Sequence, residues 1–314
     1  MNADALSSRV IDAFPADGFA PRLVIFAGVH GNEPSGVVAL QRVFEQLRTQ
    51  RVPLRGQLVG VLGNLEALRK QARFLNEDLN RLFLPAYIEQ VKAIPSGHAT
   101  EARELLDICQ LVESLEAKAE GPLFFVDCHT TSSDSIPFIS LNEGFASSLH
   151  FAHRIPAASV VGAEKEIRGC LSEWLNKRGW TGFTFEAGQH LAAPSIENQE
   201  AMIWLALLHS GCLDQGQAHP WIERARATLL QQGKQQRQVY QLKSAYRIQE
   251  GENFRMKPGF VNLQFVQQGE HLADSDGQAV LASEDAHLLM PLYQLQGNFG
   301  FFLVQEVPFP PPAR

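Results

Sequence analysis

Short apolar runs alternate with longer amphipathic stretches over the first two thirds of the chain. Apolar runs predict buried strands at 22–28, 57–64, 122–129 and 181–188. Apolar residues at helical spacing, such as Val37, Leu40, Phe44 and Leu47, predict helices at 34–50, 101–117 and 197–211. Strands that alternate with helices in this way favour a mostly parallel sheet covered by helices on both faces.

The pattern changes near residue 235, where short alternating runs separated by Gly, Asp and Pro replace the helical spacing. Such runs are typical of strands with one exposed face. We therefore expect a larger domain at 1–235 and a smaller β-rich domain at 236–314, joined by a helix and linker at 218–238. The predicted fold class is α/β, with a mixed, mostly parallel sheet flanked by helices and a smaller β-rich C-terminal domain.

Composition narrows the class of protein. The 314 residues are 45% hydrophobic and 19% charged, which is typical of a globular protein with a substantial core. The net charge of −7 argues against nucleic acid or an anionic membrane as a partner. No apolar stretch approaches the roughly 20 residues that span a bilayer, and the N-terminus lacks a secretory pattern. The four cysteines show no CxxC spacing, so we expect reduced thiols in a cytoplasmic protein; whether it forms a homodimer stays open.

Metal-binding side chains stand at the ends of three predicted strands. His30 and Glu33 follow the first strand, His129 ends the third, and Glu186 lies near the end of the fourth. Ligands of parallel α/β sheets bind outside the carboxyl ends of the strands, where these groups should converge. Two imidazoles and one carboxylate form a suitable set for catalytic zinc, since they leave a position for water or substrate. Glu186 is then a spare carboxylate beside the metal.

A single histidine at a strand end is more often a packing residue than a ligand, and HxxE also occurs by chance. Three such groups at successive strand ends are much harder to explain in that way. His150 and His153 also have ligand spacing, but no carboxylate pair lies near them in the sequence. We interpret those two histidines as surface or packing residues.

The stretch ARFLNEDLNRLF at 72–83 adds two arginines after the second strand and its loop. Either Arg73 or Arg81 alone would be interpreted as a solvated charge. Beside a zinc ion, one guanidinium can stabilise the oxyanion that forms when a carbonyl is attacked, and the other can bind a substrate carboxylate.

Four motifs in this order resemble those of the succinylglutamate desuccinylase/aspartoacylase family, whose catalytic domain is similar to zinc carboxypeptidases. They are GVHGNE, DLNR at 78–81, DCHTTSS and FEAG, and they cover the N-terminal two thirds of the chain. The resemblance implies that His30, Glu33 and His129 bind one Zn²⁺ per chain. It implies that Glu186 is the general acid/base, which deprotonates zinc-bound water and later protonates the leaving amine.

The resemblance also assigns roles around the metal. Arg73 matches the arginine that supports the tetrahedral intermediate. Asn80 and Arg81 match the pair that holds the carboxylate of the amino-acid product. Asp78 matches the carboxylate that orients the histidine of the HxxE motif, a bond that fixes the tautomer of the ligand.

Two positions depart from the family pattern. A tyrosine from the C-terminal unit reaches the active site in aspartoacylases, but the matching position here holds Phe299, with Tyr293 six residues earlier. A further substrate-binding arginine precedes the catalytic glutamate in aspartoacylases, and Arg178 and Arg168 are both candidates. Of these residues, we predict that Tyr293 and Arg178 bind the substrate.

The sequence therefore predicts a zinc-dependent amidohydrolase that deacylates a small, acidic N-acyl amino acid. The nearest alternative is a zinc carboxypeptidase acting on short peptides, which a C-terminal domain capping the cleft would exclude. A non-catalytic zinc-binding or ligand-binding module would be favoured if Glu186 were missing, but Glu186 is present. Deacylation of an amide or ester without an amino acid would leave Asn80 and Arg81 without a purpose.

Overall fold

The computed structural model describes residues 8–18, 20–94, 97, 99–214, 216, 220–233 and 237–309. Their strands form one mixed sheet of eleven strands and a separate sheet of three. The large sheet contains, in spatial order, β1 (Val10–Phe14), β3 (Gln57–Leu62), β2 (Arg22–Ala27), β4 (Leu123–Thr131), β7 (Thr181–Gln189), β5 (Phe138–Leu141), β6 (Ala158–Val161), β8 (Val239–Arg247), β14 (Phe299–Val307), β13 (Ala286–Leu289) and β10 (Gln264–Val266). The small sheet contains β12 (Gln278–Leu281), β11 (His271–Ser275) and β9 (Phe254–Met256).

The centre of the large sheet is parallel, as predicted. Strands β3, β2, β4 and β7 run parallel to one another, whereas β1 and β5 pair antiparallel with their neighbours. The four strands predicted from apolar runs are β2, β3, β4 and β7. The sequence prediction missed β1, β5 and β6, which are five, four and four residues long.

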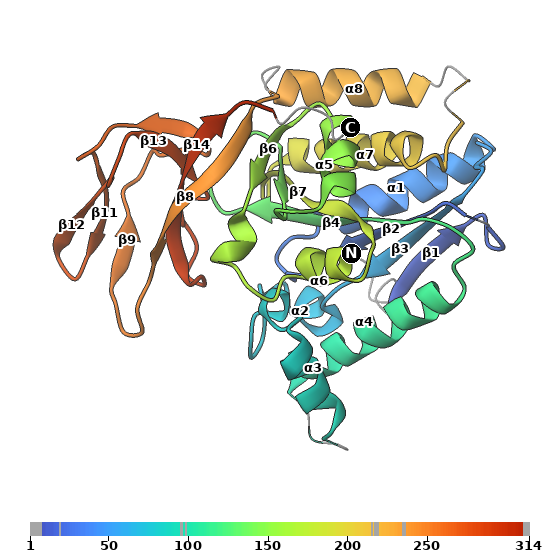
Figure 1. Cartoon of the computed structure of the whole chain (residues 1–314), viewed down its shortest axis with the longest axis horizontal. Coiled ribbons are helices and arrows are strands. Elements are labelled where there is room, and N and C mark those ends of the chain that lie inside the picture. The colour runs from blue at the N-terminus through green and yellow to red at the C-terminus, as the bar shows by residue number, and fades with distance from the viewer. Residues whose placement is uncertain are drawn as a thin grey trace.

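Helices cover both faces of this sheet (Figure 1). One face packs against α1 (Ser35–Thr49), α5 (Ala146–His153) and α7 (Ala193–His209), with α8 (Pro220–Gln232) packed on α7. The other face packs against α3 (Pro85–Lys92), α4 (Thr100–Ala117) and α6 (Leu171–Lys177). The remaining helical segments are α2 (Leu65–Lys70), η2 (Leu79–Arg81) and η3 (Ala163–Lys165). Two apolar cores result, one on each side of strands that are buried on both faces.

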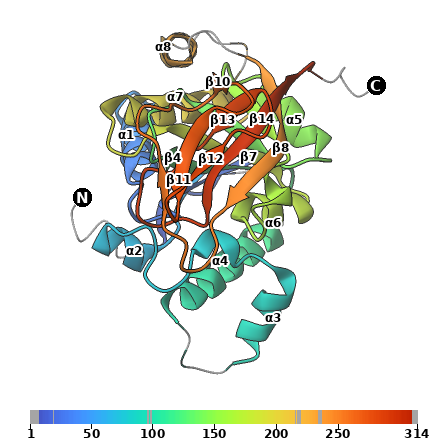
Figure 2. The same ribbon diagram turned by 90° about the vertical axis from the view of Figure 1, so that its left-hand side faces the viewer.

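The C-terminal β-rich region continues the large sheet. Strand β8 pairs parallel with β6, through Ser159 and Val239, and β14, β13 and β10 follow it antiparallel. Figure 2 shows these strands in front of β4 and β7. The predicted boundary at 235/236 lies outside the described residues, so it stays a prediction. The sheet pairing nevertheless ties the two regions together.

Two further expectations concern the whole chain. All four cysteines are unpaired, and three of them are buried. Within the described ranges, no helix combines the length and the apolar character that crossing a bilayer would require.

Candidate active site and metal centre

The loop after β2 is shaped by two glycines. Gly28 has φ of +72°, a left-handed conformation that favours glycine. A Cβ on Gly31 would lie 2.1 Å from the backbone carbonyl carbon of Ala67, so α2 packs directly against this loop. The turn places His30 and Glu33 at the carboxyl end of the sheet, where both side chains are buried.

His30, Glu33 and His129 form one compact cluster. His30 Nδ1 lies 2.9 Å from Glu33 Oε1, and His129 Nδ1 lies 3.2 Å from Glu33 Oε2. One ligand atom from each residue lies within 4.8 Å of the others. The two Nδ1 atoms and the Glu33 carboxylate are therefore close enough together to bind one divalent ion.

The other nitrogen of each imidazole faces a carboxylate. His30 Nε2 lies 3.0 Å from Asp78 Oδ1, and His129 Nε2 lies 3.1 Å from Asp127 Oδ2, although the second contact is too poorly aligned for a hydrogen bond. At His30, a proton on Nε2 leaves the Nδ1 lone pair free for a metal, and Asp78 favours that tautomer. The sequence analysis did not identify Asp127. Its position in the DCH motif could have indicated a contact with His129, because residues two apart on a strand lie on the same face.

Burial and charge act against each other in this cluster. Burial alone would raise the pKa of Glu33, but His30 and His129 hold that pKa well below its usual range. Burial opposes the charged form of His129, yet Asp127 and Glu33 raise its pKa well above the usual value. The protein groups alone therefore favour a positive charge next to Glu33. A divalent cation can supply that charge in place of a proton.

The wider site contains more carboxylates than guanidinium groups. Its carboxylates are Glu33, Asp78, Asp127 and Glu186, and its guanidinium groups are Arg73 and Arg81. Both Asp127 oxygens and Glu186 Oε2 are buried without a hydrogen-bond partner among the described residues. A divalent cation near these buried carboxyl groups would offset their negative charge, so the donor set fits a metal.

Glu186 lies beside the cluster because β4 and β7 are neighbours. His129 and Glu186 are register partners on these parallel strands. Burial, together with the charges of Glu33 and Asp127, raises the pKa of Glu186 to about 8, against the opposing effects of His129 and Arg73. A carboxyl group tuned towards neutrality can both accept and donate a proton near physiological pH.

Arg73 reaches the cluster from the loop after α2. Its Nη1 lies 3.4 Å from Glu33 Oε1, and its Nη2 lies 3.2 Å from Asp78 Oδ2. Its Nε–H is buried and has no hydrogen-bond partner in the described structure. One donor of this guanidinium therefore remains for a substrate oxygen.

Asn80 and Arg81 come from the short helix η2, which begins after Asp78. The Asp78 side chain accepts a hydrogen bond from the Asn80 backbone N–H, at 3.0 Å, and caps this turn. Asn80 Oδ1 accepts from the Leu171 N–H at 2.8 Å, which fixes the amide so that Nδ2 lies 3.4 Å from His129 Nε2. Arg81 Nη1 donates to the Asn80 carbonyl at 2.6 Å. Both side chains line the cavity beside the cluster.

Two adjoining cavities lie over the cluster. An inner cavity contains His30, His129 and Glu186, and an outer one contains Thr130 and His190. Both are lined by Arg73, Arg81, Ile167, Met290 and Phe302. Two of these shared residues belong to the C-terminal region, which therefore forms one wall of the site.

The loop between β13 and β14 connects this wall to the catalytic loops. Gln294 Oε1 lies 3.2 Å from His190 Nε2 and accepts from Asn32 Nδ2 at 3.4 Å. The Tyr293 backbone N–H donates to Ser132 Oγ at 3.1 Å. These contacts place the loop against the entrance of the site.

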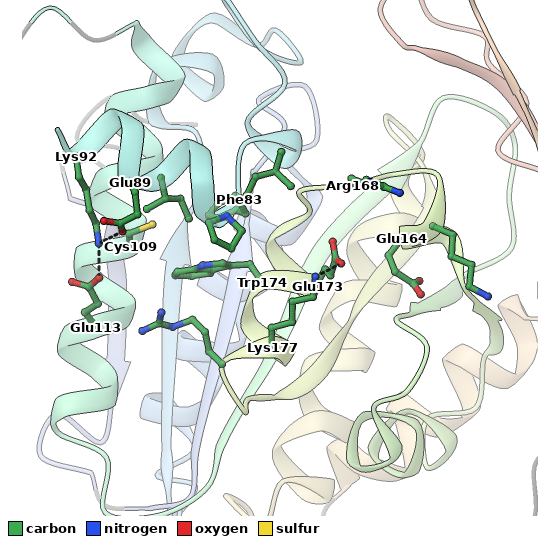
Figure 3. Close-up of a pocket in the computed structure, with 15 residues that line it drawn as sticks. Phe83, Glu89, Lys92, Cys109, Glu113, Glu164, Arg168, Glu173, Trp174 and Lys177 are labelled. Carbon is green, nitrogen blue, oxygen red and sulfur yellow. Dashed lines mark hydrogen bonds and ion pairs between the residues drawn. The ribbon is translucent and has the colours of Figure 1, made fainter. Parts of the chain in front are cut away.

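The structure does not bring Arg178 or Arg168 to the cluster of His30, Glu33 and His129. Both line a separate pocket of about 630 Å³ between α3, α4, α6 and η3 (Figure 3). Arg178 Nε donates to Glu116 Oε1 at 2.9 Å, and its guanidinium lies 4.9 Å from the centre of the Trp174 ring. The charge of Arg178 is thus compensated away from the site.

Tyr293 also points elsewhere. Its hydroxyl donates to the Lys257 carbonyl at 2.7 Å and accepts from the Phe260 N–H at 3.0 Å, both within the C-terminal region. Phe299, the position that matches the family tyrosine, lines the outer cavity with an apolar ring.

The two other histidines with ligand spacing lie in or at the end of α5. His150 Nδ1 lies 2.8 Å from the Ala146 carbonyl, and the His153 ring stacks on Phe309. Neither belongs to the group that could hold a metal.

Comparison with known proteins gives one consistent family. The model of the succinylglutamate desuccinylase/aspartoacylase catalytic domain matches residues 20–208. The succinylglutamate desuccinylase of Photorhabdus laumondii is 35% identical over 205 residues, which cover 63% of this chain and 62% of that protein. That of Serratia proteamaculans is 29% identical over 130 residues, which cover 41% of this chain and 38% of that protein. The match spans less than two thirds of the length of either relative.

Solved structures share the fold at low identity. The succinylglutamate desuccinylase of Vibrio cholerae has a TM-score of 0.68 at 16% identity, over 91% of this chain and 81% of that one. The ectoine utilization protein EutE (DoeB) of Ruegeria pomeroyi, solved with product bound, has a TM-score of 0.65 at 20% identity, over 92% and 85% of the two chains. These likenesses confirm the predicted fold class.

Proposed function

Because the chain belongs to the succinylglutamate desuccinylase/aspartoacylase family, we propose that it is a zinc-dependent amidohydrolase that removes the acyl group from a small N-acyl amino acid. One observation carries the proposal. Two imidazole Nδ1 atoms converge on the Glu33 carboxylate, and Glu186 lies next to His129 with a buried oxygen that has no partner in the described structure. This is the donor set of a catalytic zinc with a general acid/base beside it.

Each side chain has one task in the proposed reaction. A bound zinc ion would lower the pKa of water towards about 7 and polarise the scissile carbonyl. Glu186 takes the proton from the attacking water and delivers it to the nitrogen of the leaving amine. The partner-free Nε–H of Arg73 donates to the oxygen on which negative charge develops.

The substrate is held through its α-carboxylate. Arg81 and the Nδ2–H of Asn80 line the inner cavity and supply the donors for that carboxylate. Asp78 helps to fix the positions of these donors, since it contacts His30, Arg73 and the η2 turn. An acidic chain can therefore bind an anion, because local charge at the site outweighs net charge.

The wall formed by the C-terminal region favours a small substrate over a peptide. Met290 and Phe302 line both cavities, and Gln294 contacts the loops of His190 and Asn32. A peptide extending from the scissile bond would have to displace these contacts. We therefore prefer deacylation to the carboxypeptidase alternative.

The test is the zinc-loaded variant Glu186→Gln, which has the same shape and cannot take a proton. We expect the rate of amine release from N-acyl amino acids to fall by about 10²- to 10⁴-fold. Metal content, measured by elemental mass spectrometry, should not change, since Glu186 is outside the ligand set. Near-normal turnover by this variant would show that Glu186 has another role.

A further inference from the structure

The inner cavity extends away from the metal cluster along β7 and β5. Glu186 pairs in register with Phe138, and Thr184 pairs with Ser140 one step farther along. Asn142 follows on the same face, and all five side chains line the cavity. This arm of the cavity is therefore lined mostly by neutral polar groups.

Glu164, on η3, also lines this cavity, and it lines the large pocket as well. The N–H of Glu143, the residue after Asn142, donates to Glu164 Oε1 at 3.0 Å. The other oxygen, Oε2, is buried and has no hydrogen-bond partner among the described residues. A residue that lines the inner cavity thus carries a carboxylate oxygen that lacks a donor.

No cation in the described structure pairs with that oxygen. Lys165, the next residue, pairs with Glu143 instead. Arg168 is exposed and lines the neighbouring large pocket, where Figure 3 shows Glu164 at the end opposite to Lys92. Burial raises the pKa of Glu164, and the negative charges of Glu143 and Glu173 raise it further.

The two cavities also lack a counter-ion for a second substrate carboxylate. Among the described residues that line them, the guanidinium groups are those of Arg73 and Arg81, and no lysine is present. Arg73 already contacts Glu33 and Asp78, and Arg81 lies 3.8 Å from Asp78. Apart from His30 and His129 of the cluster, the other basic group among the described residues that line these cavities is His190, whose pKa is lowered by burial. An acidic side chain or an acidic acyl group would therefore be buried without compensation.

We propose that the substrate carries a single carboxylate, at its α-carbon, and a side chain that ends in a hydrogen-bond donor, of which a primary amine fits best. The amine donates to Glu164 Oε2 in the inner cavity, while Arg81 holds the carboxylate. This inference rests on the proposed function, because it assigns the substrate class of the same site.

The first test uses the zinc-loaded wild-type protein and needs no variant. Its substrates are Nα-acetyllysine and Nα-acetylornithine, the neutral analogue Nα-acetylnorleucine, and the acidic compounds N-acetylglutamate and N-succinylglutamate. We expect kcat/KM for the better amine to exceed that for norleucine about tenfold, as a charge-assisted hydrogen bond would give, and the acidic compounds to be poorest. Preference for either acidic compound would overturn the proposal.

The second test assigns the preference to Glu164. In Glu164→Gln the advantage in kcat/KM of the amine over norleucine should fall from about tenfold to about unity. Glu173→Gln is the matched control, since Glu173 lines the large pocket and pairs with Lys177, and it should keep the full preference. An unchanged preference in a folded Glu164→Gln protein would overturn the proposal.

Binding measurements distinguish a failure of this inference from a failure of the proposed function. Affinities for zinc-loaded Glu186→Gln, measured by calorimetry, report recognition without turnover. If wild-type protein cleaves none of the compounds but the amines bind about tenfold more tightly than norleucine, the proposed reaction fails and the inference stands. If the acidic compounds bind more tightly, the inference fails whatever the reaction.

Discussion

Replacing Glu186 by glutamine should stabilise the metal-free protein by an amount that grows with pH. The pKa of this carboxyl is raised from 4.5 to about 8, first by burial and then by Glu33 and Asp127. The folded protein therefore holds the proton more tightly than the unfolded chain does. Its contribution to stability is complete below pH 4.5 and is lost as the pH rises towards 8.

The size of the effect follows from the same shift. Each pKa unit corresponds to about 1.36 kcal/mol, so at pH 7 the buried carboxyl costs the fold on the order of 3 kcal/mol relative to pH 4.5. Glutamine has nothing to ionise and avoids that cost. The free energy of unfolding of Glu186→Gln minus that of the wild type should therefore increase by about 3 kcal/mol between pH 4.5 and pH 7.

Urea unfolding of chelator-treated protein, followed by circular dichroism at half-unit steps from pH 4.5 to pH 8.5, measures this difference. Glu197→Gln, an exposed carboxylate on α7, is the control and should show no such trend. Zinc should reduce the trend, because a nearby divalent cation stabilises the carboxylate form of Glu186. A difference that stays constant across this pH range would refute the burial argument for Glu186.

Three other substitutions test separate parts of the site. Asp127→Asn should weaken zinc binding by about 10- to 100-fold, measured by chelator competition, because the carboxylate that orients His129 is lost; unchanged affinity would exclude that role. Gln294→Ala should raise KM about fivefold with little change in kcat, since two long hydrogen bonds hold the loop at the entrance; an equal fall in kcat would place Gln294 in the chemistry instead. Arg178→Ala should leave kcat/KM unchanged and cost about 1 kcal/mol or less in urea unfolding, because it removes an exposed ion pair; a loss of turnover would restore the sequence-based prediction of a substrate-binding role.

The sequence predicted that His30, Glu33 and His129 lie together because of a simple geometric rule. Strands β2, β4 and β7 are adjacent and parallel, so the groups at their carboxyl ends converge. The convergence of His30 and His129 then followed from correct strand assignments alone. Glu186 followed from the same rule.

Other features depended on information that a single sequence does not carry. Strands β5 and β6 have four residues each, too few for a recognisable alternation, yet β5 contributes Phe138 and Ser140 to the cavity. Asp127 lies within an apolar run that predicts a strand buried on both faces, which hid its contact with His129. The directions of Arg178 and Tyr293 are set by Glu116 and the Lys257 carbonyl, partners distant in sequence.

The C-terminal region illustrates the same limit. Its β-rich pattern was visible, but the pattern does not reveal that β8 pairs with β6 and extends the large sheet. That pairing brings Met290 and Phe302 over the cluster. The size of the substrate space therefore depends on strand pairing rather than on any motif.

The central claim is that His30, Glu33 and His129 hold one catalytic zinc ion. Its most direct test is the zinc content of dialysed wild-type protein and of Glu33→Ala, measured by elemental mass spectrometry beside turnover of an N-acyl amino acid. We predict one zinc per wild-type chain, with turnover lost on chelation and restored by one equivalent, and no zinc or turnover in the variant. Zinc retained by a folded Glu33→Ala protein, or turnover that survives its complete removal, would contradict the account.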